Sequence, residues 1–486
     1  MGARICAGYR AGTSLVIAPV MTSRVVEAAD VATLIERYDR PGPRYTSYPT
    51  AVEFHPGFTA EHYRARLAIA AAERIQPISL YLHVPFCESR CAYCGCAVIA
   101  TKKRDVATTY LEYLEREIGM VAAALGGRRT AVQYHWGGGT PTYLSAEQIA
   151  RLDGVVQRHF DITPDAERAI EIDPRVTTRE QLVLLRKLGF NRLSFGVQDF
   201  TKAVQEAIQR RQSEAETRQL YWTARDAGFE SINFDLVYGL PCQTVESFQR
   251  TLASVVDMLP DRIAVYSYAH VPWLRPNQKA IDPLDLPDAI QKRALLGAAI
   301  ESFTGAGYES IGMDHFALPD DDLAIAARER RLHRNFMGYT TRPAPDSIAL
   351  GVSAISDVAG AFSQNHKSLA RYYEAIDAGR LPVERGYALT DDDHLRRFVI
   401  AELMCNFRLE RRQLRDRFDI EMGDYFKPEI ELLCEPGGPV ADGLLEASPE
   451  ALTVTDRGRL FVRNICMAFD RYLAAHQNRP VFSRTI

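Results

Sequence analysis

Four of the nine cysteines in the chain lie close together, in the segment FCESRCAYCGC. They are Cys87, Cys91, Cys94 and Cys96, with the spacing C-x3-C-x2-C-x-C. Clustered thiolates repel one another unless a cation holds them, so this spacing predicts a metal site. The remaining cysteines are scattered along the chain, which is not the pattern of a disulfide framework.

The compact cysteine segment favours an iron–sulfur cluster over zinc. Structural zinc sites usually take paired C-x2-C units from two separated segments, and the chain has no second C-x2-C pair. A [4Fe–4S] cluster suits a single loop that wraps around it. Three cysteines at C-x3-C-x2-C would leave one iron without a protein ligand, and that iron could bind a small molecule. Zinc and reduced structural thiols remain the alternatives on spacing alone.

The elements that must position this segment alternate between strand and helix patterns. The predicted strands are Ser79–Pro85, Val132–Trp136, Ala169–Ile172, Arg192–Gly196, Ser231–Tyr238, Arg262–Tyr268 and Glu309–Met313. The predicted helices are Ala107–Leu125, Ala146–Phe160, Arg179–Leu188, Glu214–Ala227, Val245–Met258 and Pro287–Ala306. Strands that alternate with helices imply right-handed crossovers and a parallel sheet, which here suits an incomplete TIM-like barrel.

Polar residues and glycines follow the predicted strands where each strand ends. The active sites of such barrels lie at the C-terminal ends of the strands, so we expect these residues to meet at one mouth. Besides the cysteine segment they are Gly137–Pro141, Glu171, Asp173, Gln198, Asp199, Asp235, His270, Asp314 and His315. Each of them alone could be an ordinary hydrogen-bonded structural residue, but a polar group at nearly every strand end indicates a site.

The cysteine spacing after the first strand, with a glycine-rich turn after the second, resembles the radical S-adenosylmethionine (SAM) enzymes. More narrowly, the chain resembles the oxygen-independent coproporphyrinogen III oxidases, from about Pro41 to the C-terminus. The matching motifs are GPRYTSYPT (42–50), YLHVPFCESRCAYCGC (81–96), HWGGGTPTYL (135–144), EIDPR (171–175), NRLSFGVQDF (191–200), DLVYGLP (235–241), GMDHFA (312–317), LHRNF (332–336), GVSAIS (351–356) and RNICMAFD (463–470). The number and order of these motifs make the resemblance specific.

The resemblance implies a ligand for most of the strand-end residues. Cys87, Cys91 and Cys94 would bind a [4Fe–4S] cluster, and SAM would chelate the fourth iron. Two SAM molecules are expected. The positions that match the first are Tyr81, Gly138, Glu171 and Ile355. The positions that match the second are Tyr93, Gly139, Thr140, Gln198, Arg210, Asp235 and Ala269.

Tyr81 and Cys96 are predicted to act in catalysis. The fourth cysteine of the family is generally not a cluster ligand, but it separates the oxidases from related haem chaperones, which tend to carry Phe there. The presence of Cys96 together with Tyr45–Tyr48 and Arg463–Asp470 favours the enzyme. A radical-SAM-like haem chaperone without decarboxylase activity is the alternative.

The implied reaction is the anaerobic oxidative decarboxylation of two propionate side chains of coproporphyrinogen III. A 5′-deoxyadenosyl radical from SAM would start it, and protoporphyrinogen IX would be the product, within haem biosynthesis. Expected partners are the small-molecule substrate and an electron donor such as flavodoxin or ferredoxin. We expect a cytoplasmic monomer.

The composition does not favour a nucleic-acid-binding or a membrane-spanning protein. The 58 basic and 62 acidic side chains give a net charge of −4, which does not favour binding to phosphates. No apolar run reaches the roughly 18–20 residues of a membrane span. The fold class expected is α/β: an incomplete TIM-like (β/α)6 radical SAM barrel with an N-terminal extension and a mostly helical C-terminal domain.

The domain boundaries follow from the motifs and the element pattern. Residues 1–25 are predicted to be a disordered or mis-annotated extension, with Met21 as an alternative start, and 26–75 an N-terminal substrate lid. Residues 76–320 would form the barrel, 321–364 a barrel-closing connection, and 365–486 a helical, winged-helix-like domain. The winged-helix pattern raises DNA binding, but residues 391–470 carry 17 acidic and 11 basic side chains, a net charge of −6, which argues against it.

Overall fold

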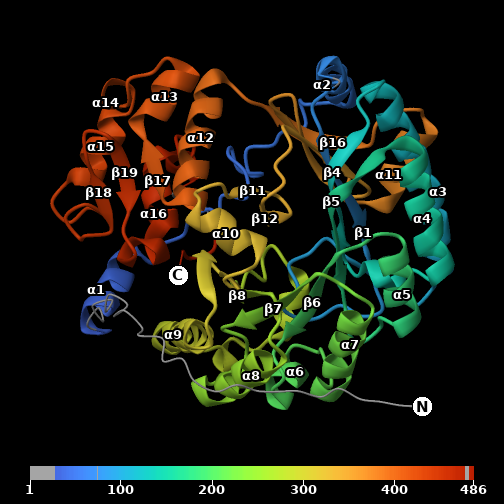
Figure 1. Cartoon of the computed structure of the whole chain (residues 1–486), viewed down its shortest axis with the longest axis horizontal. Helices are drawn as coiled ribbons and strands as arrows, with labels where there is room; N and C mark the ends of the chain where they lie inside the picture. The colour runs from blue at the N-terminus through green and yellow to red at the C-terminus, as the bar shows by residue number, and fades with distance from the viewer. Residues whose placement is uncertain (1–27, 74, 477–480, 486) are drawn as a thin grey trace, which may run out of the picture.

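The fold is built on one curved, twelve-stranded sheet, shown in Figure 1 with helices along its outer side. This computed structural model describes residues 28–73, 75–476 and 481–485. The predicted extension at residues 1–25 lies outside them. The strand order is β16-β15-β14-β13-β1-β4-β5-β6-β7-β8-β10-β9. Because the two ends of this order do not pair with each other, the sheet is an incomplete barrel.

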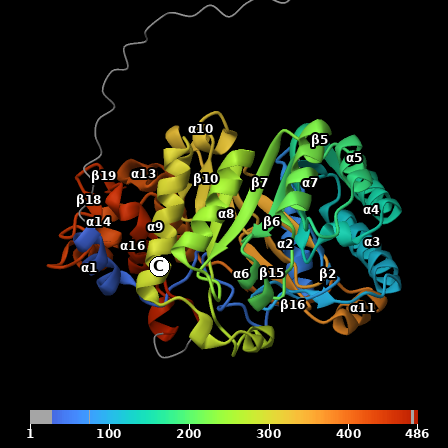
Figure 2. The same ribbon diagram turned by 90° about the horizontal axis from the view of Figure 1, so that it is seen from below.

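Six neighbouring parallel strands form the centre of the sheet, as the (β/α)6 prediction requires. They are β1 (Ile78–Val84), β4 (Thr130–Gly138), β5 (Asp161–Ile172), β6 (Arg192–Gln198), β7 (Ser231–Tyr238) and β8 (Arg262–Ser267). The helices are α2 (Ala60–Ala72), α3 (Asp105–Leu125), α4 (Ala146–His159), α5 (Arg179–Lys187), α6 (Lys202–Ala207), α7 (Glu214–Asp226), α8 (Val245–Met258) and α9 (Ala289–Gly305). Figure 2 shows α3 to α9 side by side along the outside of the strands.

The local sequence explains why these helices begin where they do. Ser145, Thr178 and Thr244 precede α4, α5 and α8, and their side-chain oxygens accept hydrogen bonds from backbone amides of the first turn. The strands are buried on both faces, as expected for a parallel sheet covered by helices. In β1, six of the seven residues are buried.

The sheet differs from the sequence prediction at both of its ends. The predicted seventh strand is β9 (Glu309–Gly312), but it does not pair with β8, because β10 (His315–Ala317) lies between them and is antiparallel to both. The predicted seventh strand is therefore present, but it is not a direct neighbour of the sixth. At the other end, β13 (Asp346–Leu350) pairs in parallel with β1, and sequence analysis missed it. The sheet continues through β14 (Ile355–Val358), β15 (Ala361–Asn365) and β16 (Val383–Ala388).

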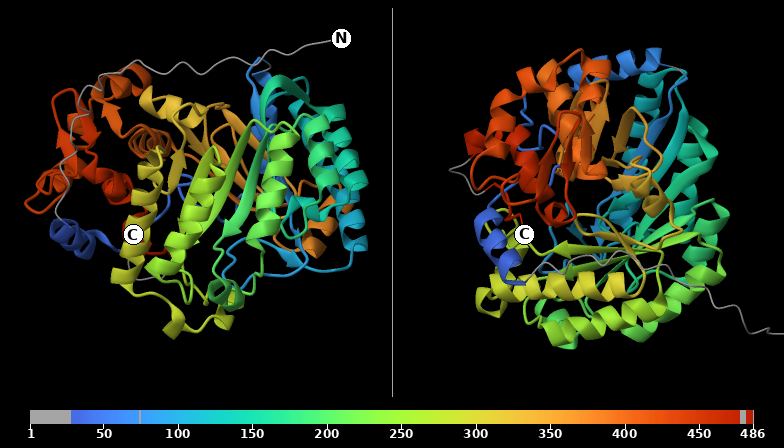
Figure 3. Two further views of the ribbon diagram at one scale, coloured as in Figure 1. Left: turned by 60° about the horizontal axis from the view of Figure 1, so that its bottom comes forward. Right: turned by 60° about the vertical axis from the view of Figure 1, so that its left-hand side comes forward.

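The C-terminal part of the chain packs beside the sheet, at the left of Figure 1, and Figure 3 shows it from two further sides. It contains a small antiparallel sheet of β17 (Arg408–Glu410), β19 (Ala451–Val454) and β18 (Leu445–Ala447). Its helices are α12 (Asp391–Asn406), α13 (Arg411–Phe418), α14 (Met422–Tyr425), α15 (Lys427–Cys434) and α16 (Val462–Cys466). Helix α11 (Leu369–Asp377) lies apart from them, beside α3 at the right of Figure 1. After β19 the chain continues to His476 in short helical turns, of which α16 is one.

The N-terminal helix α1 (Ala28–Tyr38) belongs spatially to this C-terminal part. Tyr38 packs against Phe461, with 5.5 Å between the ring centroids, and the Arg37 guanidinium lies 2.6 Å from an Asp442 carboxylate oxygen. Helix α1 and the C-terminal part therefore share one apolar cluster. Among the described residues, no helix combines the length and apolar character that crossing a membrane requires.

Arg128 joins three segments beneath the sheet and is fully buried. Its guanidinium donates to the carbonyl oxygens of Ala70, Gln76 and Pro77, at 3.0, 2.8 and 3.0 Å, and it is paired with Asp346 at the start of β13. The second Asp346 oxygen accepts from the Ala359 amide at 2.6 Å. This pair ties the end of α2 and the start of β1 to β13.

Replacement of Arg128 by leucine should therefore destabilise the whole fold. Arg128→Leu leaves the Asp346 carboxylate buried without its partner, so we expect the free energy of unfolding to fall by about 3–5 kcal/mol. Denaturant unfolding followed by circular dichroism measures it. The control is Arg116→Leu, because Arg116 and Asp377 form an exposed pair whose loss should cost less than about 1 kcal/mol. Equal losses in the two variants would contradict this account.

Candidate active site

A cavity of about 550 Å³ lies at the C-terminal ends of the parallel strands and contains most of the predicted site. The predicted residues that line it are Cys87, Cys91, Tyr93, Cys94, Cys96, Gly138, Gly139, Thr140, Glu171, Gln198, Arg210, Asp235 and Ala269. Tyr81 and Ile355 are outside this lining. Four other strand-end residues were expected at the same mouth but do not line the cavity, namely Asp199, His270, Asp314 and His315.

The loop that carries the cysteines is held by two side chains far away in the sequence. The Asn277 amide nitrogen lies 3.3, 3.0 and 3.0 Å from the carbonyl oxygens of Cys91, Ala92 and Cys94. The neighbouring Gln278 amide donates to the carbonyl oxygens of Tyr93 and Ala269, at 3.0 and 3.1 Å. Backbone groups of a loop need such partners when no sheet or helix supplies them. Sequence analysis missed both residues, because nothing in a lone amide side chain shows its distant partner.

Positive charge is concentrated around Cys91. Asp173, which follows β5, is paired with two arginines: Arg175 at 2.6 Å and Arg210 at 3.0 and 3.1 Å, the latter with both terminal nitrogens. Nitrogens of the same two guanidinium groups lie 3.8 Å from the Cys91 sulfur. Burial alone would raise the pKa of Asp173, but Arg210 and Arg175 lower it to about 2. The carboxylate is thus ionised and fixes two cations beside a thiol.

The remaining cysteines differ in their surroundings. Hydrogen bonds from Cys96 lower the pKa of the Cys94 thiol to about 6, and the Cys96 backbone amide lies 3.4 Å from that sulfur. Burial raises the pKa of Cys87 to about 11, and its sulfur lies 3.5 Å from the Thr140 hydroxyl oxygen. Bound metal would deprotonate such thiols irrespective of these values.

The glycine turn after β4 brings Glu171 to the cavity. The Gly138 amide donates to the Glu171 carboxylate at 3.1 Å, and a His135 ring nitrogen lies 3.4 Å from the other oxygen. These contacts keep the pKa of Glu171 below its ordinary value although its position inside the barrel opposes them. The Glu171 side chain keeps 43% of its surface exposed, so its carboxylate is accessible from the cavity.

Close contacts within the protein require the glycines of this turn. A Cβ on Gly139 would come within 2.6 Å of the Phe86 carbonyl oxygen, and one on Gly138 within 2.7 Å of the His83 ring. Gly138 also has φ +119°, a conformation that side chains rarely adopt. The missing side chains of Gly138 and Gly139 make room for the segment that leads into the cysteine loop.

Tyr81 and Ile355, which were also predicted, do not line the cavity. The Tyr81 ring stacks on His135 with 5.8 Å between centroids, and its hydroxyl lies 3.1 Å from a His83 ring nitrogen. A Cβ on Gly137 would meet both Glu171 and the Tyr81 ring, so Tyr81 is a direct neighbour of Glu171. Ile355 lies on β14, where it is opposite Gln364 of β15.

Two more predicted residues lie on the next two strands, Gln198 at the end of β6 and Asp235 within β7. Gln198 has φ +68° at the irregular end of β6, a strained conformation of the kind that clusters at functional sites. Asp235 on β7 accepts hydrogen bonds from Ser194 at 2.7 Å and Asn233 at 2.9 Å. Burial, with a contribution from Glu171, raises the pKa of Asp235 to about 6 against these hydrogen bonds.

The residues present fit an iron–sulfur cluster better than a single metal ion. Within the described ranges, no three His, Cys, Asp or Glu side chains are grouped as ligands of one ion. Three thiols of one loop nevertheless face one cavity, and thiolates are the ligands of iron–sulfur clusters. The guanidinium groups beside Cys91 supply charge that opposes the negative charge of such a donor set.

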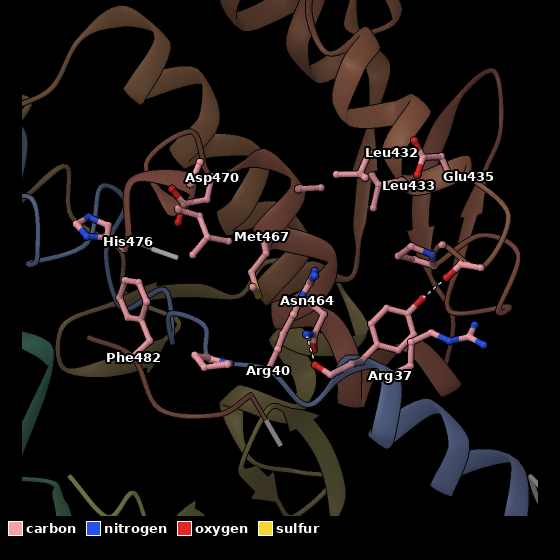
Figure 4. Close-up of a pocket in the computed structure, with 18 of the residues that line it drawn as sticks. Arg37, Arg40, Leu432, Leu433, Glu435, Asn464, Met467, Asp470, His476 and Phe482 are labelled. Atoms are coloured by element: carbon pink, nitrogen blue, oxygen red, sulfur yellow. Dashed lines mark hydrogen bonds between the residues drawn. The ribbon is translucent and has the colours of Figure 1, made fainter. Parts of the chain in front are cut away.

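A larger cavity, of about 640 Å³, lies elsewhere and holds none of the predicted site residues. Figure 4 shows it between the end of α1 and the C-terminal segments, with Arg37 and Asn464 on one side and His476 and Phe482 on the other. Arg37 is already paired with Asp442. Size alone therefore does not identify the active site of this protein.

Comparison with known proteins agrees with this geometry. The Radical SAM superfamily model matches residues 81–255, and the HemN C-terminal domain model matches residues 389–461. The first range contains the cysteine loop and the ends of strands β1, β4, β5, β6 and β7. The second covers α12 to β19 of the C-terminal part.

Curated relatives match over nearly the whole chain. The oxygen-independent coproporphyrinogen III oxidase of Escherichia coli K12 is 46% identical over 454 residues, which is 93% of this chain and 98% of that protein. The protein of the same name from Synechocystis is 42% identical over 94% of this chain and 98% of that protein. A solved structure of E. coli coproporphyrinogen III oxidase (HemN), described as a radical SAM enzyme, superposes with a TM-score of 0.85 at 46% identity, covering 91% of this chain and 98% of that one. The chain therefore belongs to the oxygen-independent coproporphyrinogen III oxidase family of radical SAM enzymes.

Proposed function

We propose that this protein decarboxylates two propionate side chains of coproporphyrinogen III to vinyl groups, without oxygen, and so forms protoporphyrinogen IX for haem biosynthesis. The observation that carries the proposal is the loop of Cys87, Cys91 and Cys94, which opens into the same cavity as the carboxylates of Glu171 and Asp235. Each propionate would lose a hydrogen atom from its β-carbon, then CO2 and one electron, so an electron acceptor is required.

The three cysteines would hold a [4Fe–4S] cluster, which as in other radical SAM proteins supplies the electron that converts SAM to methionine and a 5′-deoxyadenosyl radical. Glu171 is placed to accept hydrogen bonds from the first SAM, because its carboxylate is ionised and accessible. The glycine turn at Gly138 and Gly139 presents backbone groups beside it. Tyr81 supports Glu171 from behind, which suits a positioning role better than direct catalysis.

The second SAM would lie toward Tyr93, Thr140, Gln198, Asp235 and Ala269, which line the same cavity. The guanidinium N–H groups of the predicted residue Arg210 already have hydrogen-bond partners within the protein. Besides its pair with Asp173, it donates to the Gly196 carbonyl at 2.6 Å and to Gln212 at 3.2 Å. We therefore infer that Arg210 acts here through Asp173 and the cysteine loop, and that any contact with SAM requires this pairing to open.

The protein must also keep water and oxygen away from a reactive radical. The segment Arg44–Thr50 is proposed as part of a lid, supported by the ion pair of Arg44 with Asp314 near the end of β8. We further propose a cytoplasmic monomer that receives electrons from a flavodoxin or ferredoxin.

The proposal is tested by anaerobic turnover with reconstituted cluster, SAM, dithionite, coproporphyrinogen III and cell extract as electron acceptor. Mass spectrometry should show the stepwise loss of two CO2 units. If the cluster forms and SAM binds but the substrate is not consumed, the enzyme assignment fails. Binding of haem to that protein would then indicate the chaperone alternative.

The four cysteines should separate into ligands and a non-ligand. Alanine in place of Cys87, Cys91 or Cys94 should abolish both the visible absorbance of the reconstituted cluster and turnover. Cys96→Ala is the matched variant from the same loop, and it should keep the absorbance because Cys96 is not expected to bind iron. Iron analysis and absorbance spectra measure this, and loss of the cluster in Cys96→Ala would contradict the ligand assignment.

Asn277 should control how firmly the loop holds its cluster. Asn277→Ala removes the donor shared by three carbonyl oxygens of the loop, so we expect a chelator to bleach the cluster several-fold faster than in the wild type. Lys279→Ala, at an exposed position of the same helical turn, serves as control. Identical bleaching rates for Asn277→Ala and the wild type would show that these hydrogen bonds do not matter for retention.

A further inference from the structure

A third cavity, of about 140 Å³, shares a wall with the active-site cavity. Ser267, at the end of β8, lines both. The smaller one, called here the cationic cavity, is also lined by Arg44, by Arg293 of α9, by Asp314 in the turn after β9, and by Arg463 of α16. It lies where the end of the parallel sheet, α9 and the C-terminal part of the chain meet.

The charges around the cationic cavity do not balance. Four arginines line it, and Asp314 is the single carboxylate among its lining residues. Asp314 is paired with Arg44, and Arg459 lies 3.3 Å from Asp456 outside the cavity. In the described part of the chain, no carboxylate pairs with Arg293 or Arg463.

Arg463 shows how costly this arrangement is. It is 6% exposed, and its guanidinium donates only to backbone carbonyl oxygens: Pro43 at 2.9 Å, Gly42 at 2.6 Å, and Arg484 and Thr485 at 3.4 and 3.0 Å. Burial and the nearby Arg44 lower its pKa to about 10. A buried charge without an opposite charge is unfavourable, so this surplus of positive charge points to an anion that completes the site.

The rest of the lining indicates what kind of anion fits. Leu296, Ile300, Met313 and Phe461 make much of the wall apolar. An inorganic ion would make no favourable contact with an apolar wall. A carboxylate on a short hydrocarbon arm would pack its arm against that wall and pair its charge with the arginines. The volume suits one such arm and not a macrocycle.

We propose that the cationic cavity binds a propionate carboxylate of the tetrapyrrole substrate, namely one that is not being decarboxylated. This inference rests on the proposed function. The substrate carries four propionates and two of them react, so at any moment others are available to anchor the ring. Because Ser267 separates the two cavities, an anchored ring can present a reacting propionate to the neighbouring active-site cavity. Arginine suits this role because its planar fork binds carboxylates with two hydrogen bonds.

Arg293 is the residue that tests this with least damage to the fold. It is half-buried and has no hydrogen-bond or ion-pair partner among the described residues, so Arg293→Gln removes charge without breaking a native contact. We expect the KM for coproporphyrinogen III to rise about tenfold while kcat changes little, since one charge-assisted hydrogen bond is lost outside the reacting centre. Arg293→Lys should recover part of this loss. Arg250→Gln, an exposed position on neighbouring α8, removes the same charge and should change nothing.

A binding measurement separates this inference from the proposed function. Fluorescence titration of the reconstituted, SAM-loaded protein with coproporphyrin III reports affinity without turnover, and Arg293→Gln should weaken it about tenfold. If the wild type turns over but Arg293→Gln leaves both KM and this affinity unchanged, the cationic cavity is not a carboxylate site and the proposed function stands. If the wild type binds coproporphyrin III, Arg293→Gln weakens binding, and no turnover occurs, the site stands and the proposed function fails. If the wild type neither binds nor turns over, both are overturned.

Discussion

The pairing of Asp173 with Arg175 and Arg210 is the interaction on which the rest of the site depends. Thiolates held close together repel one another, and the two guanidinium groups beside Cys91 oppose that repulsion. A buried arginine in a cavity wall is unfavourable without an opposite charge, and Asp173 supplies that charge from the end of β5. The carboxylate therefore links the sheet to the cysteine loop. Asn277 and Gln278 complete the support by binding the carbonyl oxygens of the same loop.

A second constraint is the direction of the strands. Because β1 and β4 to β8 are parallel, their carboxyl ends meet at one edge, and residues scattered over more than a hundred positions of sequence line one cavity. The same geometry explains the place of Asp314. Strand β9 is antiparallel to β10, which is antiparallel to β8, so β9 ends at the same edge as β8 without touching it. Asp314 therefore comes close to Ser267 in the cationic cavity instead of reaching the active-site cavity.

Local patterns predicted the central elements well, because burial and capping act over short stretches of chain. Helix α8 (Val245–Met258) and strand β7 (Ser231–Tyr238) have the predicted bounds. Most strand-end residues also lie in one cavity, as parallel strands require. What the sequence could not show are interactions between distant segments. Three examples join residues far apart in the sequence: the parallel pairing of β13 with β1, the buried pair of Arg128 with Asp346, and the pair of Asp173 with Arg210. The place of Asn277 beneath the cysteine loop has no local signal either.

The central claim is that this cavity brings a SAM-derived radical to the β-carbon of a substrate propionate. It is tested most directly with coproporphyrinogen III deuterated at the β-carbons of its propionates, in a single anaerobic turnover with the reconstituted protein. The account predicts deuterium in the 5′-deoxyadenosine that is released, together with loss of CO2 from the substrate. Formation of 5′-deoxyadenosine without deuterium, while the substrate is still decarboxylated, would contradict it.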